Sequence, residues 1–288
     1  MKLTNGIDVI VRFHDVERVD ELRRNFFSLI CQNFRPITIH IVTQNFSSSQ
    51  ITSLKKSLNL TWEIDRSVKV KFQNCNVSSG DARSALLNEG IRASTHRYVA
   101  FLDYDDVIYP EAYQLLVNDL VDSGAAISFG GILATDVELV GGAFHNLSKK
   151  IPWRGRNLID LFGQNHCPIS SFVVDRRRVS SIDLQFNETL SMSEDYDFLL
   201  RVCCKYSSSF HLKEKILGEY YHKNDGSNTV RTISNDNAIR KLQWESTEEF
   251  LAHQRMKLRL SKSILEQLNL NDLTNVTIAD CIEMFGDL

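Results

Sequence analysis

The first 130 residues alternate short β-rich runs with amphipathic helices, and this alternation limits the chain to few folds. Apolar residues at helical spacing follow each β-rich run except the last. The predicted strands are 7–13, 37–43, 68–72, 98–102 and 125–129, and the predicted helices lie near residues 15–30, 51–58, 81–91 and after Pro110. Strands that alternate with helices form parallel sheets covered on both faces. We therefore predict an α/β fold with a central, mostly parallel sheet.

The fourth predicted strand shows where a ligand would bind. Residues 98–102 are almost continuously apolar, which is typical of a central strand buried on both faces. The strand runs directly into the acidic segment 103–106. Ligands of open parallel sheets bind beyond the carboxyl ends of the strands, so this segment marks the expected site. No glycine-rich turn follows the first strand, which argues against a dinucleotide-binding site.

Composition places the chain among ordinary globular proteins. Of its 288 residues, 43% are hydrophobic and 24% are charged, and no stretch approaches the roughly 18 consecutive apolar residues of a spanning helix. The net charge is −3, whereas nucleic-acid binding needs a basic excess, so we expect no nucleic-acid partner. The six cysteines are scattered without CxxC spacing, which indicates buried, reduced thiols in the cytoplasm.

Asp103 and Asp105 are candidate metal ligands. Residues two apart in an extended segment point the same way, so both carboxylates would face one side. Such oxygen ligands suit Mg²⁺ or Mn²⁺, which is usually shared with substrate phosphates. The alternative is that these acids only cap the helix that begins near Pro110, a role that Asp106 also fits.

Three segments resemble the GT-A glycosyltransferases of family 2, in the same order along the chain. Residues 82–113 resemble the family's helix ending in R-N-x-G-I, its buried strand and its F-L-D-x-D-D motif. Residues 192–202, MSEDYDFLLRV, resemble the E-D-W-D-F-W-L-R segment of the inverting members. Residues 218–230 resemble a strand followed by a polar His/Ser loop. The resemblance covers roughly residues 6–230 and implies a Rossmann-like GT-A sheet.

The resemblance also implies roles for four acidic residues. Asp103 would contact the donor ribose or share the metal, and Asp105 would bind Mn²⁺ or Mg²⁺ and thereby the diphosphate. Asp195 would be the general base that takes the proton of the acceptor hydroxyl, with Glu194 beside it as an orienting or acceptor-binding carboxylate. The sequence also allows a capping box from Ser191 to Glu194, which would place Asp195 in the first turn of a helix.

Further donor-binding positions follow from the same resemblance. They are Arg12, Gln44, Arg83, Asn88 and His222. Gln44 stands where many members carry an acid that reads the uracil edge, and an amide offers both a donor and an acceptor. The family has an arginine at the position that Leu87 occupies here. Arg83 lies one turn earlier on the same face and either reaches the phosphates instead or is an ordinary surface residue. In the family, a histidine near this place contacts the diphosphate or the metal, and either His222 or Asn224 aligns with it.

The sequence indicates the acceptor-binding residues less clearly than the donor-binding ones. Trp153 and His166 are candidates that would stack on or hydrogen-bond a sugar, although a tryptophan at this place is also a common core residue. Lys223 and Ser227 are additional candidates near the diphosphate.

The chain divides into a GT-A domain, residues 1–234, and a helical extension, residues 235–288. Within the first, residues 1–130 would bind the nucleotide sugar and residues 131–234 the acceptor. A long helical stretch is predicted over 236–268. Its basic residues are Arg255, Lys257, Arg259 and Lys262. They would contact anionic lipid, pack against a second copy of the chain, or lie on a solvated helix.

These expectations combine into one function. The chain would be an inverting, metal-dependent glycosyltransferase that uses a nucleoside diphosphate sugar, with UDP favoured over dTDP and GDP, and a glycan or lipid-linked acceptor. The family suggests bacterial surface polysaccharide assembly in the cytoplasm, with peripheral contact to the inner face of the membrane left open. A catalytically impaired donor-binding or scaffold module is the alternative. A sugar nucleotidyltransferase is disfavoured, because the glycine-rich phosphate loop is missing.

Overall fold

The computed structural model describes residues 3–62, 67–77, 81–140, 143–147, 150–223 and 238–285. Asn224 and Ser227, two of the candidates for donor binding, lie outside the described residues.

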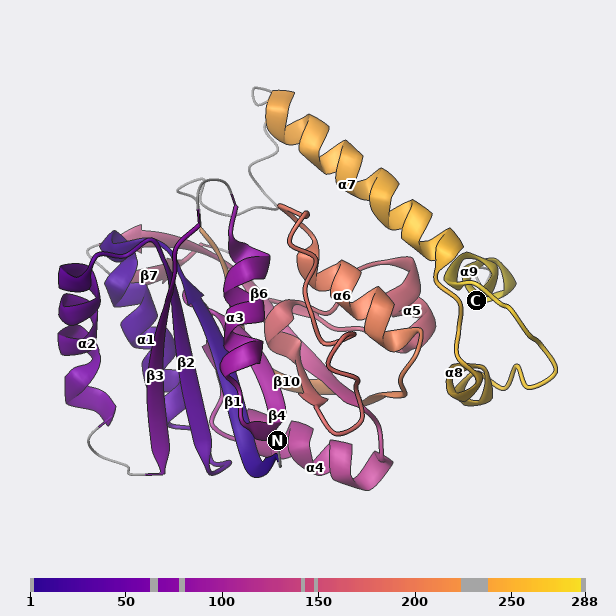
Figure 1. Cartoon of the computed structure of the whole chain (residues 1–288), viewed down its shortest axis with the longest axis horizontal. Coiled ribbons are helices and arrows are strands. Elements are labelled where there is room, and N and C mark those ends of the chain that lie inside the picture. The colour runs from indigo at the N-terminus through magenta and orange to yellow at the C-terminus, as the bar shows by residue number, and fades with distance from the viewer. Residues whose placement is uncertain are drawn as a thin grey trace.

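One mostly parallel sheet organises the described part of the chain (Figure 1). Its strands are β1 (Thr4–Phe13), β2 (Ile37–Gln44), β3 (Val68–Cys75), β4 (His96–Asp103), β5 (Val107–Ile108), β6 (Ile127–Val140), β7 (Ala143–Asn146), β8 (Ile151–Trp153), β9 (Phe172–Asp175) and β10 (Ser208–Lys223). The order is β3-β2-β1-β4-β9-β6-β10-β5, with β7 and β8 paired to β6. β1 to β4 are parallel, β9 is antiparallel to β4 and β6, and β10 is parallel to β6. The predicted fold class is confirmed.

Helices cover both faces of the sheet. They are η1 (Val16–Arg18), α1 (Val19–Ile30), α2 (Ser48–Trp62), α3 (Arg83–Ala93), α4 (Ala112–Ser123), α5 (Leu158–Gly163), η2 (Ile169–Ser171), α6 (Glu194–Cys203), α7 (Ala238–Lys257), α8 (Lys262–Gln267) and α9 (Ile278–Phe285). Apolar residues of α1, α2 and α4 form one buried cluster, and those of α3, α5 and α6 form the other.

The central strand β4 explains why its sequence is apolar throughout. Val99 and Phe101 point into the cluster with α3, α5 and α6, whereas Ala100 and Leu102 point into the cluster with α1, α2 and α4. All four side chains are buried, as the alternation of a strand covered on both faces requires. The strand therefore holds the acidic segment that follows it in a rigid position.

The C-terminal tail differs from the single long helix predicted over 236–268. α7 ends at Lys257, and the chain is extended before α8 begins at Lys262. The N–H of Leu260 donates to the carbonyl of Val276 (2.8 Å), and the N–H of Ile278 donates to that of Leu258 (3.0 Å). This local pairing replaces helical hydrogen bonds and buries Leu260. Figure 1 shows α8 and α9 at the C-terminal end of α7, on the side of α5 and α6.

Two further expectations concern cysteines and membranes. All six cysteines are free, and four are buried, but Cys31 is exposed, contrary to the prediction of buried thiols, because it follows the last residue of α1 at the surface. In the part of the chain that the structure describes, no helix is both long and apolar enough to cross a membrane.

Candidate active site

Three strands bring polar side chains to one edge of the sheet. Arg12 near the end of β1 lies opposite Asp103 at the end of β4, and Lys223 is the last residue of β10. These strands run in the same direction, so their carboxyl ends meet at that edge. Glu194 and Asp195 begin α6 beside them. Residues from the predicted donor half, 1–130, and from the predicted acceptor half, 131–234, therefore lie side by side at this edge.

Arg12 joins the acidic motifs of the two halves. Its Nε donates to Oδ1 of Asp103 (2.6 Å) and its Nη2 to Oδ2 (3.1 Å). Its Nη1 donates to Oε1 of Glu194 at 2.5 Å. Burial alone would lower the pKa of Arg12, but the charges of Asp103 and Glu194 raise it well above its usual value. The arginine is therefore a fixed positive charge between β4 and α6.

The loop after β4 is held in place by α1. Nδ2 of Asn25 donates to the carbonyls of Asp103 (2.7 Å) and Asp106 (2.9 Å). The buried Asp106 accepts a hydrogen bond from the N–H of Tyr221 at 3.2 Å. Burial, and then the charges of Asp105 and Asp103, raise the pKa of Asp106 well above its usual range. The alternative that Asp106 caps the following helix is wrong, because α4 begins after Glu111 without a side-chain cap.

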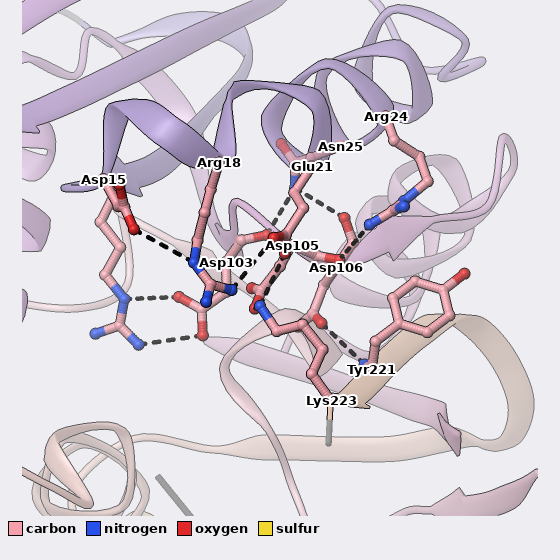
Figure 2. Close-up of polar contacts among 11 residues, drawn as sticks. Asp15, Arg18, Glu21, Arg24, Asn25, Asp103, Asp105, Asp106, Tyr221 and Lys223 are labelled. Atoms are coloured by element: carbon pink, nitrogen blue, oxygen red, sulfur yellow. Dashed lines mark hydrogen bonds and ion pairs between the residues drawn. The ribbon is translucent and has the colours of Figure 1, made fainter. Parts of the chain in front are cut away.

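Asp105 is paired with a buried lysine. Nζ of Lys223 lies 2.7 Å from Oδ2 of Asp105 and 2.8 Å from Oε2 of Glu21. Figure 2 shows this ammonium group between the two carboxylates, with Arg18 on the other side of Glu21. Arg18 donates to Oε1 of Glu21 at 3.2 Å. The side chain of Lys223 is 1% exposed, so the ion pair is shielded from solvent.

The residues present do not fit the expected Mn²⁺ or Mg²⁺ as they stand. Both oxygens of Asp103 are bound by Arg12, and one oxygen of Asp105 is bound by Lys223. Within the described ranges, no three His, Cys, Asp or Glu side chains are placed to hold a metal ion. A divalent ion needs carboxylate oxygens whose charge is not already matched by other cations.

Asp195 lies in the first turn of α6, where its Oδ1 accepts a hydrogen bond from the N–H of Tyr196 (2.8 Å). Burial, and then the charge of Glu194, raise the pKa of Asp195 to about 7. The capping box predicted from Ser191 is wrong: Ser193 precedes the helix with φ +55° and makes no side-chain cap. The carbonyl of Ser191 accepts a hydrogen bond from Arg83 instead.

A cavity of about 540 Å³ opens at this point. Arg12, Asp103 and Asp195 line it together, so the structure brings the two predicted acidic motifs into one space. The other lining residues include Arg83, Asp106, Trp153, Gln164, Asn165, Glu194, Tyr220, Trp244, Glu248 and Arg255. Aromatic side chains with a few polar groups are typical of a small-molecule site.

Like Asp105 and Lys223, four other predicted residues do not line this cavity. Gln44 ends β2, next to Cys75 of β3. His166 is half-buried between cavity-lining residues of the segment that precedes β9. Asn88 is buried: its amide donates to the carbonyl of Phe186 (2.9 Å) and accepts from the same residue's N–H (2.7 Å). The fourth residue is His222.

His222 and Trp153 form an aromatic group at the end of β10. The ring of His222 lies 5.2 Å from that of Trp153 and 4.8 Å from that of Tyr220, and its Nδ1 lies 3.6 Å from Oδ1 of Asp136. Trp153 also stacks on Tyr220 at 5.5 Å. Arg83 does line the cavity, and its guanidinium pairs with Asp81 (Nε to Oδ2, 2.7 Å).

Several cavity residues were missed by sequence reasoning. The sequence could have indicated Tyr220, because alternate residues of a strand face the same side and Tyr220 lies two positions before the predicted His222. Trp244, Glu248 and Arg255 lie on α7, and one helical face carries all three. Nothing in the sequence indicates that this face turns toward the sheet. Arg255 donates to the hydroxyl of Tyr196 (2.9 Å), which anchors α7 to α6.

Comparison with known proteins identifies the architecture. The family model described as glycosyl transferase family 2 matches residues 8–181, more than half of the chain. The chain belongs to this family. It is therefore a family 2 glycosyltransferase by sequence, with the GT-A fold that its sheet displays.

A curated relative is the uncharacterized glycosyltransferase YibD of Escherichia coli (strain K12), which is 30% identical over 118 residues. The match spans 41% of this chain and about a third (31%) of that relative. Crystal structures of S. aureus TarS 1-349 are similar in fold. The complex with UDP has a TM-score of 0.53 at 14% identity and covers 75% of this chain and 60% of that one. The complex with UDP-GlcNAc has a TM-score of 0.52 at 13% identity and covers 75% and 58%.

Proposed function

We propose that this family 2 glycosyltransferase transfers a sugar from a nucleoside diphosphate donor to a hydroxyl of a glycan or lipid-linked acceptor, with inversion. The observation that carries the proposal is the placement of Asp195. Its carboxylate lines the same cavity as Asp103 and Arg12 at the carboxyl ends of the strands, and its pKa is raised to about 7. A base is most effective when its pKa lies near the working pH.

The reaction needs a base on one side of the sugar and positive charge on the other. Asp195 takes the proton of the acceptor hydroxyl as the oxygen attacks the anomeric carbon. The bond to the diphosphate breaks on the opposite face, which inverts the configuration in one displacement. Arg12 and Arg83 line the cavity and offer positive charge to the leaving diphosphate. Glu194 stays ion-paired with Arg12, and its charge helps to raise the pKa of Asp195.

For the donor, we propose a UDP-sugar, with dTDP and GDP as alternatives. S. aureus TarS, which shares the fold, was crystallised with UDP and with UDP-GlcNAc. Asp103 would contact the ribose and Gln44 the base, with Asn88 and His222 as the remaining predicted donor residues. The Mn²⁺ or Mg²⁺ expected from the sequence is not part of this proposal, because the carboxylates of Asp103 and Asp105 are already paired with Arg12 and Lys223.

For the acceptor, we propose a sugar that rests against Trp153 and Tyr220, which stack on each other beside the cavity. His166 stays a predicted acceptor residue. Residues 1–130 would bind the donor, residues 131–234 the acceptor, and residues 235–288 would form the extension. Bacterial surface polysaccharide assembly in the cytoplasm, and a membrane or self-contact through the extension, complete the proposal.

The test is release of nucleoside diphosphate from a panel of UDP-, dTDP- and GDP-sugars, with saccharide acceptors. We expect one nucleotide class to be turned over, and Asp103→Asn to lose most of that turnover. Asp122→Asn serves as the control, because this exposed aspartate of α4 lies outside the cavity. Binding of a nucleotide without turnover of any sugar nucleotide would favour the scaffold alternative instead.

A further inference from the structure

Lys223 occupies an unusual position for a lysine. Its ammonium group is buried where the ends of β10 and β4 meet α1, and it bridges Asp105 and Glu21 (2.7 and 2.8 Å; Figure 2). Two carboxylates lie within ion-pair distance of the ammonium group on either side, and they hold the lysine as a cation at this place.

Two cations hold four of the carboxylates in this region. Arg12 binds Asp103 and Glu194, and Lys223 binds Asp105 and Glu21. Burying a charge is costly without a partner, so these pairs depend on each other. A divalent ion at Asp105 would have to displace an ammonium group that is only 1% exposed and that Glu21 holds from the far side.

We propose that Lys223 takes the place of a divalent ion beside Asp105, so that the protein binds its nucleoside diphosphate donor without metal. The inference rests on the proposed donor chemistry. Lys223 neutralises Asp105, and the diphosphate meets Arg12 and Arg83, which line the cavity. Arg12 already pairs with Asp103 and Glu194, and Arg83 pairs with Asp81, so the diphosphate shares these two guanidinium groups with carboxylates.

The first experiment measures binding of UDP, dTDP and GDP to the full chain by calorimetry, in EDTA and in Mn²⁺. We expect one nucleotide to bind in EDTA, with a Kd that changes by less than about threefold when Mn²⁺ is present. Binding that appears only with Mn²⁺ would overturn the inference and leave the proposed function standing. Absence of binding under both conditions would overturn the proposed donor chemistry and the inference with it.

The second experiment uses the metal alone as the probe, without nucleotide. Direct titration with Mn²⁺, followed by electron paramagnetic resonance, should show no bound ion in the wild type. Lys223→Gln should gain a Mn²⁺ site, because the carboxylates of Asp105 and Glu21 lose their partner. In EDTA, nucleotide affinity of this variant should fall roughly tenfold or more, and Mn²⁺ should restore it.

Two further variants distinguish the loss of the Lys223 charge from a loss of folding. Glu21→Gln/Lys223→Gln removes one buried charge of each sign, so it should fold; because only the carboxylate of Asp105 remains, it should bind Mn²⁺ more weakly than Lys223→Gln. Lys205→Gln removes a half-exposed lysine that pairs with Asp183 at 2.5 Å and does not line the cavity, and it should behave like the wild type. If neither Lys223 variant gains a Mn²⁺ site, Lys223 does not take the place of the metal.

Discussion

Asp195 carries the chemistry at the scale of single residues, and its ionisation should control the rate. Its pKa is raised to about 7 by burial and by Glu194. Only the ionised carboxylate accepts a proton, so kcat/KM should increase with pH and be half-maximal near pH 7. Glu194→Gln removes one negative charge beside Asp195, and the midpoint should move to lower pH.

The pH profile of Glu249→Gln is the matched control, because Glu249 is exposed on α7 and outside the cavity lining. A midpoint that stays in place in Glu194→Gln would contradict the coupling between the two carboxylates.

Gly90, the glycine of the segment that resembles R-N-x-G-I, has a packing role. A Cβ at this position would lie 2.4 Å from Cγ2 of Ile10, so α3 packs directly against β1 only because residue 90 is glycine. Gly90→Ala should reduce the free energy of unfolding by about 1–3 kcal/mol, the usual cost of overpacking. Chemical denaturation measures it, and a stability equal to that of the wild type would contradict this close approach.

At the scale of elements, local sequence signals were sufficient for the parallel half of the sheet. Apolar β-rich runs predicted β1 to β4, apolar residues at helical spacing predicted α1 to α3, and Pro110 marked the start of α4. After Lys257, the alternation of Leu258 and Leu260 with basic residues fits an extended segment, but no local pattern indicates that this segment pairs with Val276. The ion pair of Lys223 with Glu21 joins residues 202 positions apart, which no local pattern reveals.

α7 forms one wall of the cavity, and its Trp244 faces the space that also contains Asp195. Because α7 follows the predicted acceptor half, we expect Trp244 to contact the acceptor. Trp244→Ala should raise the KM for the acceptor roughly fivefold and leave donor affinity unchanged, since stacking on an aromatic ring contributes about 1 kcal/mol. Met256→Ala, at a position 60% exposed on the same helix, is the control. Equal effects on donor and acceptor would contradict this assignment.

At the scale of the whole molecule, the tail and the sheet share one core. Leu251, Ile264 and Cys281 belong to the same buried cluster as Phe198 of α6 and Phe101 of β4. The proposed extension, residues 235–288, should therefore unfold together with the rest of the chain.

Ile264→Ala tests this sharing. Because Ile264 is fully buried, the substitution should lower the free energy of unfolding by about 2–5 kcal/mol. Calorimetry should still show one transition. Leu242→Ala, at a position 64% exposed, should change the stability little. Two separate transitions, with only one shifted by Ile264→Ala, would show that the extension is an independent domain.

The proposed transfer reaction depends on Asp195 as the base, so the most direct measurement compares Asp195→Asn with the wild type. Donor affinity is measured by calorimetry, and turnover by release of nucleoside diphosphate in the presence of acceptor. We predict that turnover falls at least roughly 100-fold, as expected for the loss of a general base, while the donor Kd changes by less than about threefold. Turnover equal to that of the wild type would contradict the assignment of Asp195 and the proposed mechanism.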